Sequence, residues 1–353
     1  MDKVLFIFLL AVNTCCLSGY AKMQTDTFTF RFEGRRYSGE IDKPAENVAK
    51  AIIVIVPGYG KTNMVGGKDW KGLRNLFAEQ GYACVVWDKA GCGKSEGVFD
   101  INQPVQNSAS EVLAALAELK SRNIPGSEKI GLWGISRAGW ICPLVIAQYP
   151  IAFWISVSGT DDKENFGYLL EKNFLIEGRT KAQTEMLMNE WRKGIEIART
   201  GGTFEENLKA TENLRKDSFY MYITNNYMPI KDGYLKWQEG IKSGKYTYEE
   251  KTELFIYVHG FDTILSKINC PVLAIFGEKD ANVDWRKTKA LYEKTIGKNP
   301  AGLLTIKTFP NGDHGLLECK TGGIREDLRN SDFCPGFYRT MTTWLNNLLE
   351  KGQ

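Results

Sequence analysis

The chain has 353 residues, of which 43% are hydrophobic and 25% charged, a composition that supports a packed globular core. Its formal net charge is only +3 and its basic residues are dispersed, so nothing indicates a nucleic-acid-binding segment, and no acidic tail is present. The length allows one large α/β domain with an insertion, or two modest domains.

The N-terminus reads as a processing signal. Lys3 precedes an apolar run over residues 4–12, and Gly19-Tyr20-Ala21 forms a small-x-small cleavage site. The run is too short to span a bilayer, and no other segment looks transmembrane. We therefore predict a signal peptide over residues 1–21 and a secreted or periplasmic protein with no stable membrane span. The less favoured alternative is a lipoprotein anchored through Cys15 or Cys16.

Removal of the signal leaves six cysteines, an even number that permits disulfides in an exported protein. Cys84, Cys142 and Cys270 lie in apolar runs, which favours buried thiols. Cys319 and Cys334 lie in a polar loop and are the best candidate pair, whereas the pattern assigns nothing to Cys92. No Cys-x-x-Cys or His-rich spacing indicates zinc, so we expect neither a metal nor a cofactor.

The first predicted element is a hairpin, because residues 27–40 alternate apolar and polar side chains around Glu33-Gly34. Residues 51–56 form a continuous apolar run, typical of a strand buried on both faces, which ends at Pro57-Gly58-Tyr59-Gly60. The pattern then predicts a helix over 70–80, a strand over 82–87, an amphipathic helix over 105–122 and a strand leading to Ser136.

Further buried strands are predicted over 151–157, 272–276 and 303–309, and a closing amphipathic helix over 337–349. Strands that alternate with helices of this length indicate a doubly wound, mostly parallel α/β sheet. Residues 161–261 differ, because they are rich in Lys, Glu, Asn and aromatic residues with helical periodicity. We predict a helical cap there, between core segments 22–160 and 262–353; the alternative is a surface excursion remote from the site.

The sequence Gly134-Ile135-Ser136-Arg137-Ala138-Gly139 lies between a predicted strand and a predicted helix, which is the context of a nucleophile elbow. Small residues must flank the serine because the turn is tight. Ser136 is thus the candidate nucleophile.

A serine nucleophile needs a base and an orienting acid. The chain has only two histidines. His314 follows a predicted strand, where catalytic residues of such sheets gather, whereas His259 has no strand before it. His314 is therefore the predicted base. Asp280, after the strand over 272–276, is the predicted acid, with Asp284 and Glu278 as alternatives.

The oxyanion of the reaction needs two converging backbone donors. We expect the N–H of Arg137 and the N–H of Tyr59, with Gly60 or Lys61 as alternatives to Tyr59. The Arg137 side chain would favour an anionic substrate group or pair with an acid of the insertion, and the second is preferred. Gly60-Lys61-Thr62 and Gly93-Lys94-Ser95 lack the first glycine of a phosphate-binding loop, which argues against nucleotide binding.

Together these motifs resemble the α/β-hydrolase-fold serine hydrolases, the superfamily of esterases, lipases and peptidases. Four segments carry the resemblance: residues 57–60, the loop Asp88–Gly97, the elbow at 134–139, and residues 270–280 followed by His314. The resemblance implies the Ser-Asp-His order and makes the 88–97 loop structural rather than catalytic. The chain departs from the pattern at Ala138, where Gly is usual, and at Pro57, where many relatives have His.

The predicted function is an exported serine hydrolase that cleaves small-molecule carboxylic esters through an acyl-enzyme. Alternatives on the same scaffold are an aminopeptidase-like serine peptidase and a thioesterase, and a third is a non-catalytic binding protein. A peptidase would need acids to anchor the peptide terminus; Glu205-Glu206 and Glu249-Glu250 are candidates, but they look like solvated faces. Acyl specificity, alcohol specificity and oligomeric state stay open.

Aromatic residues of the insertion would either line an acyl or aryl pocket or pack between helices: Trp191, Phe219, Tyr220, Tyr222, Tyr227 and Trp237.

Overall fold

The structure is a computed structural model that describes residues 23–350, apart from 46–47, 68–69, 164, 225–230, 245–246 and 252–253. The predicted signal peptide, with Cys15 and Cys16, and Tyr227 lie outside the described residues.

Eight described strands form one sheet in the order β1-β2-β4-β3-β5-β6-β9-β10. β1 (Met23–Phe32) and β2 (Arg35–Pro44) form an antiparallel hairpin at one edge, and β2 also runs antiparallel to β4 (Ala83–Trp87). The other pairings are parallel, which confirms the predicted doubly wound, mostly parallel α/β sheet. They involve β3 (Ile52–Val56), β5 (Ile130–Ile135), β6 (Phe153–Val157), β9 (Val272–Gly277) and β10 (Leu304–Phe309).

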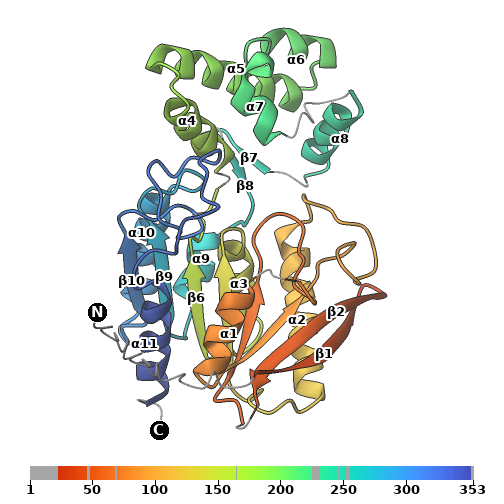
Figure 1. Ribbon diagram of the computed structural model, residues 1–353. Coiled ribbons are helices and arrows are strands. Elements are labelled where there is room, and N and C mark those ends of the chain that lie inside the picture. The colour runs from red at the N-terminus through yellow and green to blue at the C-terminus, as the bar shows by residue number, and fades with distance from the viewer. Residues whose placement is uncertain are drawn as a thin grey trace, which may run out of the picture.

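Helices cover both faces of the sheet (Figure 1). Ile52 and Val54 of β3 belong to the core on one face, and Ile53 and Ile55 to the core on the other, as the two-residue period of a strand requires. The first core is closed by α2 (Val105–Ser121), α3 (Ala138–Ile146), α9 (Phe261–Ser266) and α10 (Trp285–Lys294). The second is closed by α1 (Lys71–Glu79) and α11 (Phe337–Glu350).

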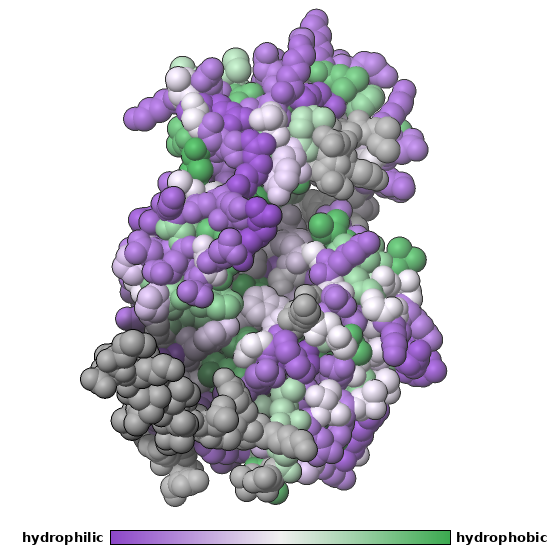
Figure 2. All heavy atoms as spheres, in the orientation of Figure 1, coloured by the Kyte–Doolittle hydropathy of each residue, from purple (hydrophilic) through white to green (hydrophobic). Residues whose placement is uncertain are grey.

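Residues 166–256 form a helical unit that lies at the top of the molecule in Figure 1. Its own small core includes Leu170, Phe174, Leu187 and Phe219. On the face shown in Figure 2, many of the coloured side chains of this unit are hydrophilic. The unit contains α4 (Phe166–Ile176), α5 (Lys181–Arg199), α6 (Phe204–Ala210), the 3₁₀ turn η1 (Leu214–Lys216), α7 (Ser218–Ile223), α8 (Lys231–Lys242), β7 (Thr247–Glu249) and β8 (Leu254–Ile256). A further 3₁₀ turn, η2 (Ile296–Lys298), follows α10 in the core.

All six cysteines of the described chain are free thiols, so the proposed Cys319–Cys334 pairing is wrong. The Cys319 thiol instead donates to the carbonyl of Asn311 at 3.2 Å, and Cys334 is packed into the core beneath α11. Within residues 23–350 as described, no helix combines the length and apolar character needed to cross a bilayer.

Candidate active site

Ser136 lies directly after β5 with a φ of +57°, in the left-handed region that non-glycine residues seldom adopt. Its N–H donates to the carbonyl of Val157 on β6 at 2.9 Å, and its own carbonyl accepts from Gly139 at the start of α3. A Cβ on Gly134 would lie 2.8 Å from both Ala138 Cβ and Cys142 Sγ. The small residues of the motif therefore allow the tight turn that presents the Ser136 hydroxyl.

Asp280 follows β9 by three residues and contacts His314. The distance from Asp280 Oδ2 to His314 Nδ1 is 2.8 Å, and the Asp280 carboxylate is fully buried. Its other oxygen accepts the N–H groups of Asn282 and Val283 at 2.8 and 2.9 Å. The Tyr168 hydroxyl of α4 donates to the Asp280 carbonyl at 3.0 Å. Contacts on both carboxylate oxygens thus hold this acid in one orientation.

His314 lies in the turn that follows β10, and its imidazole is 18% exposed. Asp313 Oδ1 shapes this turn by accepting the N–H groups of Gly315 and Leu317, both at 2.8 Å. Burial of the imidazole lowers the His314 pKa, but the charge of Asp280, its hydrogen bond and the charge of Asp313 outweigh burial. The net result is a pKa above the ordinary histidine value.

The alternative residues lie elsewhere. His259 is exposed, and its Nε2 lies 3.0 Å from the hydroxyl of Thr247 in β7. The Asp284 carboxylate faces Lys287 at 3.8 Å, and the carbonyl of Glu278 accepts the indole N–H of Trp285. Of the three acids considered from the sequence, only Asp280 contacts His314 in the described structure.

The turn after β3 packs directly against Ser136. A Cβ on Gly58 would lie 3.1 Å from Ser136 Cβ, so glycine permits this close approach. Lys89 Nζ donates to the carbonyls of Gly58 and Gly60 at 2.6 and 2.9 Å, on either side of Tyr59. Burial, followed by the nearby charge of Arg137, lowers the Lys89 pKa to about 8.

Sequence reasoning missed Lys89. The only signal in the sequence is its position in the loop 88–97, for which the resemblance implies a structural role. The neighbouring residues of that loop also tie the same turn: Lys89 N–H donates to Thr62 Oγ1, and Asp88 Oδ1 accepts the N–H of Met64, each at 2.8 Å.

Arg137 is only 4% exposed, and its side chain does not take the role expected of it. Its guanidinium donates to Ser108 Oγ at 3.0 Å and to the carbonyl of Gln103, and lies 5.3 Å from the ring centre of Tyr59. The expected pairing with an acid of the insertion is wrong, because its hydrogen-bond partners lie at the start of α2 and in the loop before it. The Arg137 side chain therefore supports the turn beside Ser136.

Ser136 and His314 line one cavity of about 980 Å³. The helical unit contributes Phe166, Leu169 and Ile223, and Tyr257 follows the unit directly. Among the described lining residues there is no Asp or Glu, and Lys61 is the single cation. A cavity of this size and apolar character suits a neutral organic ligand. In the described part of the chain, no group of three or more His, Cys, Asp and Glu side chains could hold a metal ion.

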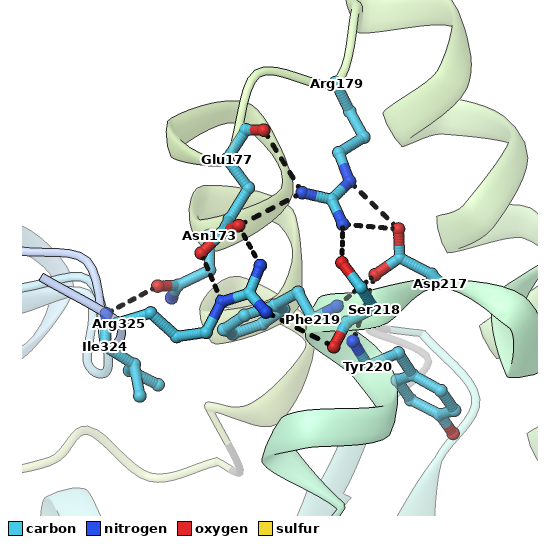
Figure 3. A network of polar contacts seen from close by, with 9 residues as sticks. All are labelled: Asn173, Glu177, Arg179, Asp217, Ser218, Phe219, Tyr220, Ile324 and Arg325. Carbon is cyan, nitrogen blue, oxygen red and sulfur yellow. Dashed lines mark hydrogen bonds and ion pairs between the residues drawn. The ribbon is translucent and has the colours of Figure 1, made fainter.

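A polar network joins the helical unit to the loop that follows His314 (Figure 3). Asn173 of α4 is fully buried; its Oδ1 accepts the N–H of Ile324 at 2.8 Å, and its Nδ2 donates to the carbonyl of Ala281 at 3.1 Å. Beside it, Arg325 pairs with Glu177. Helix α4 therefore contacts both the turn of Asp280 and the loop after His314.

The sequence profile of the X-Pro dipeptidyl-peptidase (S15) family matches residues 34–314. The chain belongs to this family of serine hydrolases. The match contains the elbow, the Asp280 turn and His314.

Solved structures share the architecture. The Pyrococcus furiosus esterase Pf2001 is 13% identical with a TM-score of 0.53, and 93% of each chain is covered. Mouse alpha/beta hydrolase domain-containing protein 10 is 15% identical with a TM-score of 0.52, covering 93% of this chain and 100% of that one. A Pyrococcus horikoshii acylaminoacyl peptidase is 16% identical with a TM-score of 0.52, covering 93% of this chain and 41% of that one. These likenesses show the α/β-hydrolase fold.

A curated relative, the acyltransferase drtE of Aspergillus calidoustus, is 22% identical over 156 residues. The aligned region covers 41% of this chain and spans about half the length of that relative.

Proposed function

We propose that this serine hydrolase cleaves neutral, largely apolar carboxylic esters, using Ser136, His314 and Asp280. One observation carries the proposal: Ser136 and the Asp280-bound His314 open into the same cavity, and no described lining residue is acidic. Such a cavity binds an uncharged ester without leaving a buried charge unpaired.

In the proposed reaction, Ser136 Oγ attacks the acyl carbon while His314 accepts the hydroxyl proton. Because Nδ1 of His314 is bound to Asp280, Nε2 is the nitrogen that acts as the base. The N–H groups of Tyr59 and Arg137 stabilise the oxyanion. His314 then gives this proton to the leaving alcohol as the ester C–O bond breaks. In the second half of the reaction His314 takes a proton from water, and the resulting hydroxide attacks the acyl carbon. The bond to Ser136 Oγ breaks, His314 returns the proton to that oxygen, and the acid is released.

The family also contains dipeptidyl peptidases, which makes peptide hydrolysis the second candidate. A free peptide N-terminus is a cation and needs an anionic anchor. The acids considered for that role are engaged elsewhere: Glu206 caps α6 through Thr203, Glu205 faces Lys231, Glu250 pairs with Arg199, and Glu249 pairs with Lys163. Together with the lining of the cavity, this favours an ester over a peptide.

The test compares wild type and Ser136→Ala on three substrate sets: nitrophenyl esters, X-Pro dipeptidyl nitroanilides and acyl thioesters. We expect wild type to prefer the esters, and the variant to lose about 10⁶-fold in kcat, as removal of a triad serine does elsewhere. Folding of the variant is checked by circular dichroism. Ester turnover that survives in Ser136→Ala would rule out this nucleophile, and a preference for X-Pro substrates would favour the second candidate.

A further inference from the structure

A second cavity lies inside the helical unit, away from Ser136. Its volume is about 360 Å³, within the range of cavities that hold small ligands. Aromatic rings make up much of its described wall, contributed by Phe166, Trp191, Tyr220, Trp237, Phe255 and Tyr257.

Three polar side chains of this wall, Asn207, Thr211 and Tyr234, are bonded within the protein. Asn207 donates to the carbonyl of Gly194 at 2.9 Å, Thr211 donates to the carbonyl of Asn207 at 2.7 Å, and the Tyr234 hydroxyl donates to the carbonyl of Gly202 at 2.8 Å. These groups gain nothing from a polar ligand, whereas the ring faces gain from an apolar one. The chemistry of the wall therefore selects an apolar occupant.

Two residues belong to both cavities. Phe166, the first residue of α4, and Tyr257, directly after β8, line the cavity of Ser136 as well as the cavity in the helical unit. Ring contacts continue on both sides: Phe166 lies 6.4 Å from Trp191, and Tyr257 lies 4.7 Å from Trp140 of the catalytic cavity, measured between ring centres. Phe166 and Tyr257 thus form a wall that the two cavities share.

We propose that the cavity in the helical unit is a second compartment of the substrate site, which takes the extended alkyl or aromatic part of the ester. This inference rests on the proposed ester hydrolysis and adds a substrate class: esters whose acyl or alcohol group is too long for the space at Ser136. The substrate passes between Phe166 and Tyr257, and its apolar end leaves water for the aromatic wall.

Two substitutions change the compartment in opposite directions. Ile195→Trp on α5 fills it, because Ile195 is a lining residue with 6% exposure. Trp237→Ala on α8 enlarges it. Leu235→Ala is the matched control, since Leu235 lies on the same helix but is 49% exposed.

The experiment measures kcat/KM for nitrophenyl esters from acetate to decanoate, and for acetate esters of alcohols of increasing length. The first set tests an acyl occupant and the second an alcohol occupant. In wild type, each methylene that enters the compartment should raise kcat/KM by about fourfold. Ile195→Trp should remove this gain for the long members of one set and leave acetate turnover within about twofold, whereas Trp237→Ala should move the optimum to longer chains.

The compartment would be overturned if kcat/KM changed equally for short and long esters in both variants. It would also be overturned if both variants showed the same dependence on chain length as Leu235→Ala. Either result would leave the proposed ester hydrolysis intact. Absence of turnover on every ester would instead overturn the proposed function and the compartment with it. The two variants are predicted to act in opposite directions, so a fold defect in one does not reproduce the expected pattern.

Discussion

At the scale of single residues, the site depends on contacts that orient groups before a substrate arrives. Asp280 is bonded on both carboxylate oxygens, and Ser136 holds a left-handed backbone conformation between β5 and α3. Such preorganisation is where much of the rate enhancement of hydrolases arises. Two predictions belong to this scale.

The first concerns the acid limb of the pH profile. His314 acts as a base only when neutral, and its pKa is raised, so kcat/KM should rise with pH through a value above about 6.5. In Asp280→Asn the larger of the two raising charges is gone, only that of Asp313 remains, and burial still lowers the His314 pKa, so this limb should move to lower pH. The same change should lower kcat on the order of 10⁴-fold, because an amide does not hold the required tautomer. Steady-state kinetics from pH 5 to 9 measure both effects; an unmoved acid limb would contradict the assignment of the pair.

The second concerns Lys89, which holds the carbonyls on both sides of Tyr59. In Lys89→Met the turn loses both hydrogen bonds to the Lys89 ammonium group. We expect kcat to fall roughly 10- to 100-fold with little change in KM, because a displaced Tyr59 N–H would stabilise the oxyanion of the transition state less well. Wild-type activity should also decline above pH about 8, where the ammonium group loses its proton. The charge of Arg137 lowers the pKa of Lys89, and the charge of Glu111 raises it.

Lys89→Arg should restore part of kcat and remove the alkaline decline. Lys94→Met serves as control, because Lys94 is an exposed lysine of the same loop. If Lys89→Met affects only thermal stability and leaves kcat and the pH profile unchanged, Lys89 does not position the oxyanion turn.

At the scale of elements, α4 of the helical unit contacts both the turn of Asp280 and the loop after His314. The network of Figure 3 contains the buried amide of Asn173 and the partly exposed ion pair of Arg325 and Glu177. Loss of either should lower the free energy of unfolding, but by different amounts. The buried amide of Asn173 bonds two backbone groups that would otherwise lie unpaired. The Arg325 side chain beside Glu177 is 31% exposed, so water weakens the attraction between the two charges.

We therefore expect Asn173→Ala to lower the free energy of unfolding by about 1–3 kcal/mol, because it leaves the Ile324 N–H and the Ala281 carbonyl without this partner. Arg325→Ala should cost only about 0–1 kcal/mol, as exposed ion pairs do. Urea denaturation of the two variants and wild type measures the difference. A larger loss for Arg325→Ala than for Asn173→Ala would show that the exposed pair, rather than the buried amide, secures α4.

At the scale of the whole molecule, one sheet organises both cores and the site. The continuous apolar runs are buried on both faces, and residues at the ends of β3, β5, β9 and β10 meet at one edge of the sheet. An ion cluster with a buried Arg74–Asp42 pair ties the antiparallel hairpin to this body: Arg74 of α1 bonds Asp42 and Glu40 of β2 and the carbonyl of Met64. Arg74 lies 32 positions from Asp42 and 34 from Glu40 in the chain, and no local pattern signals their contact.

The sequence by itself determined the fold class, the positions of the main strands along the chain and the Ser-Asp-His candidates, because hydrophobic period and turn chemistry are local properties. It missed α9, which has six residues, and α10, whose buried side chains are only Trp285, Thr288 and Tyr292. Export through residues 1–21 stays a prediction from that pattern alone.

Only the tertiary structure decided which acid meets His314, where Arg137 points, that Cys319 and Cys334 are free, and that Lys89 holds the turn beside Ser136. It also decided that the described wall of the cavity lined by Ser136 and His314 is without acids. These features are contacts between segments far apart in the chain, and they depend on the distances and directions that packing imposes rather than on any spacing along the sequence.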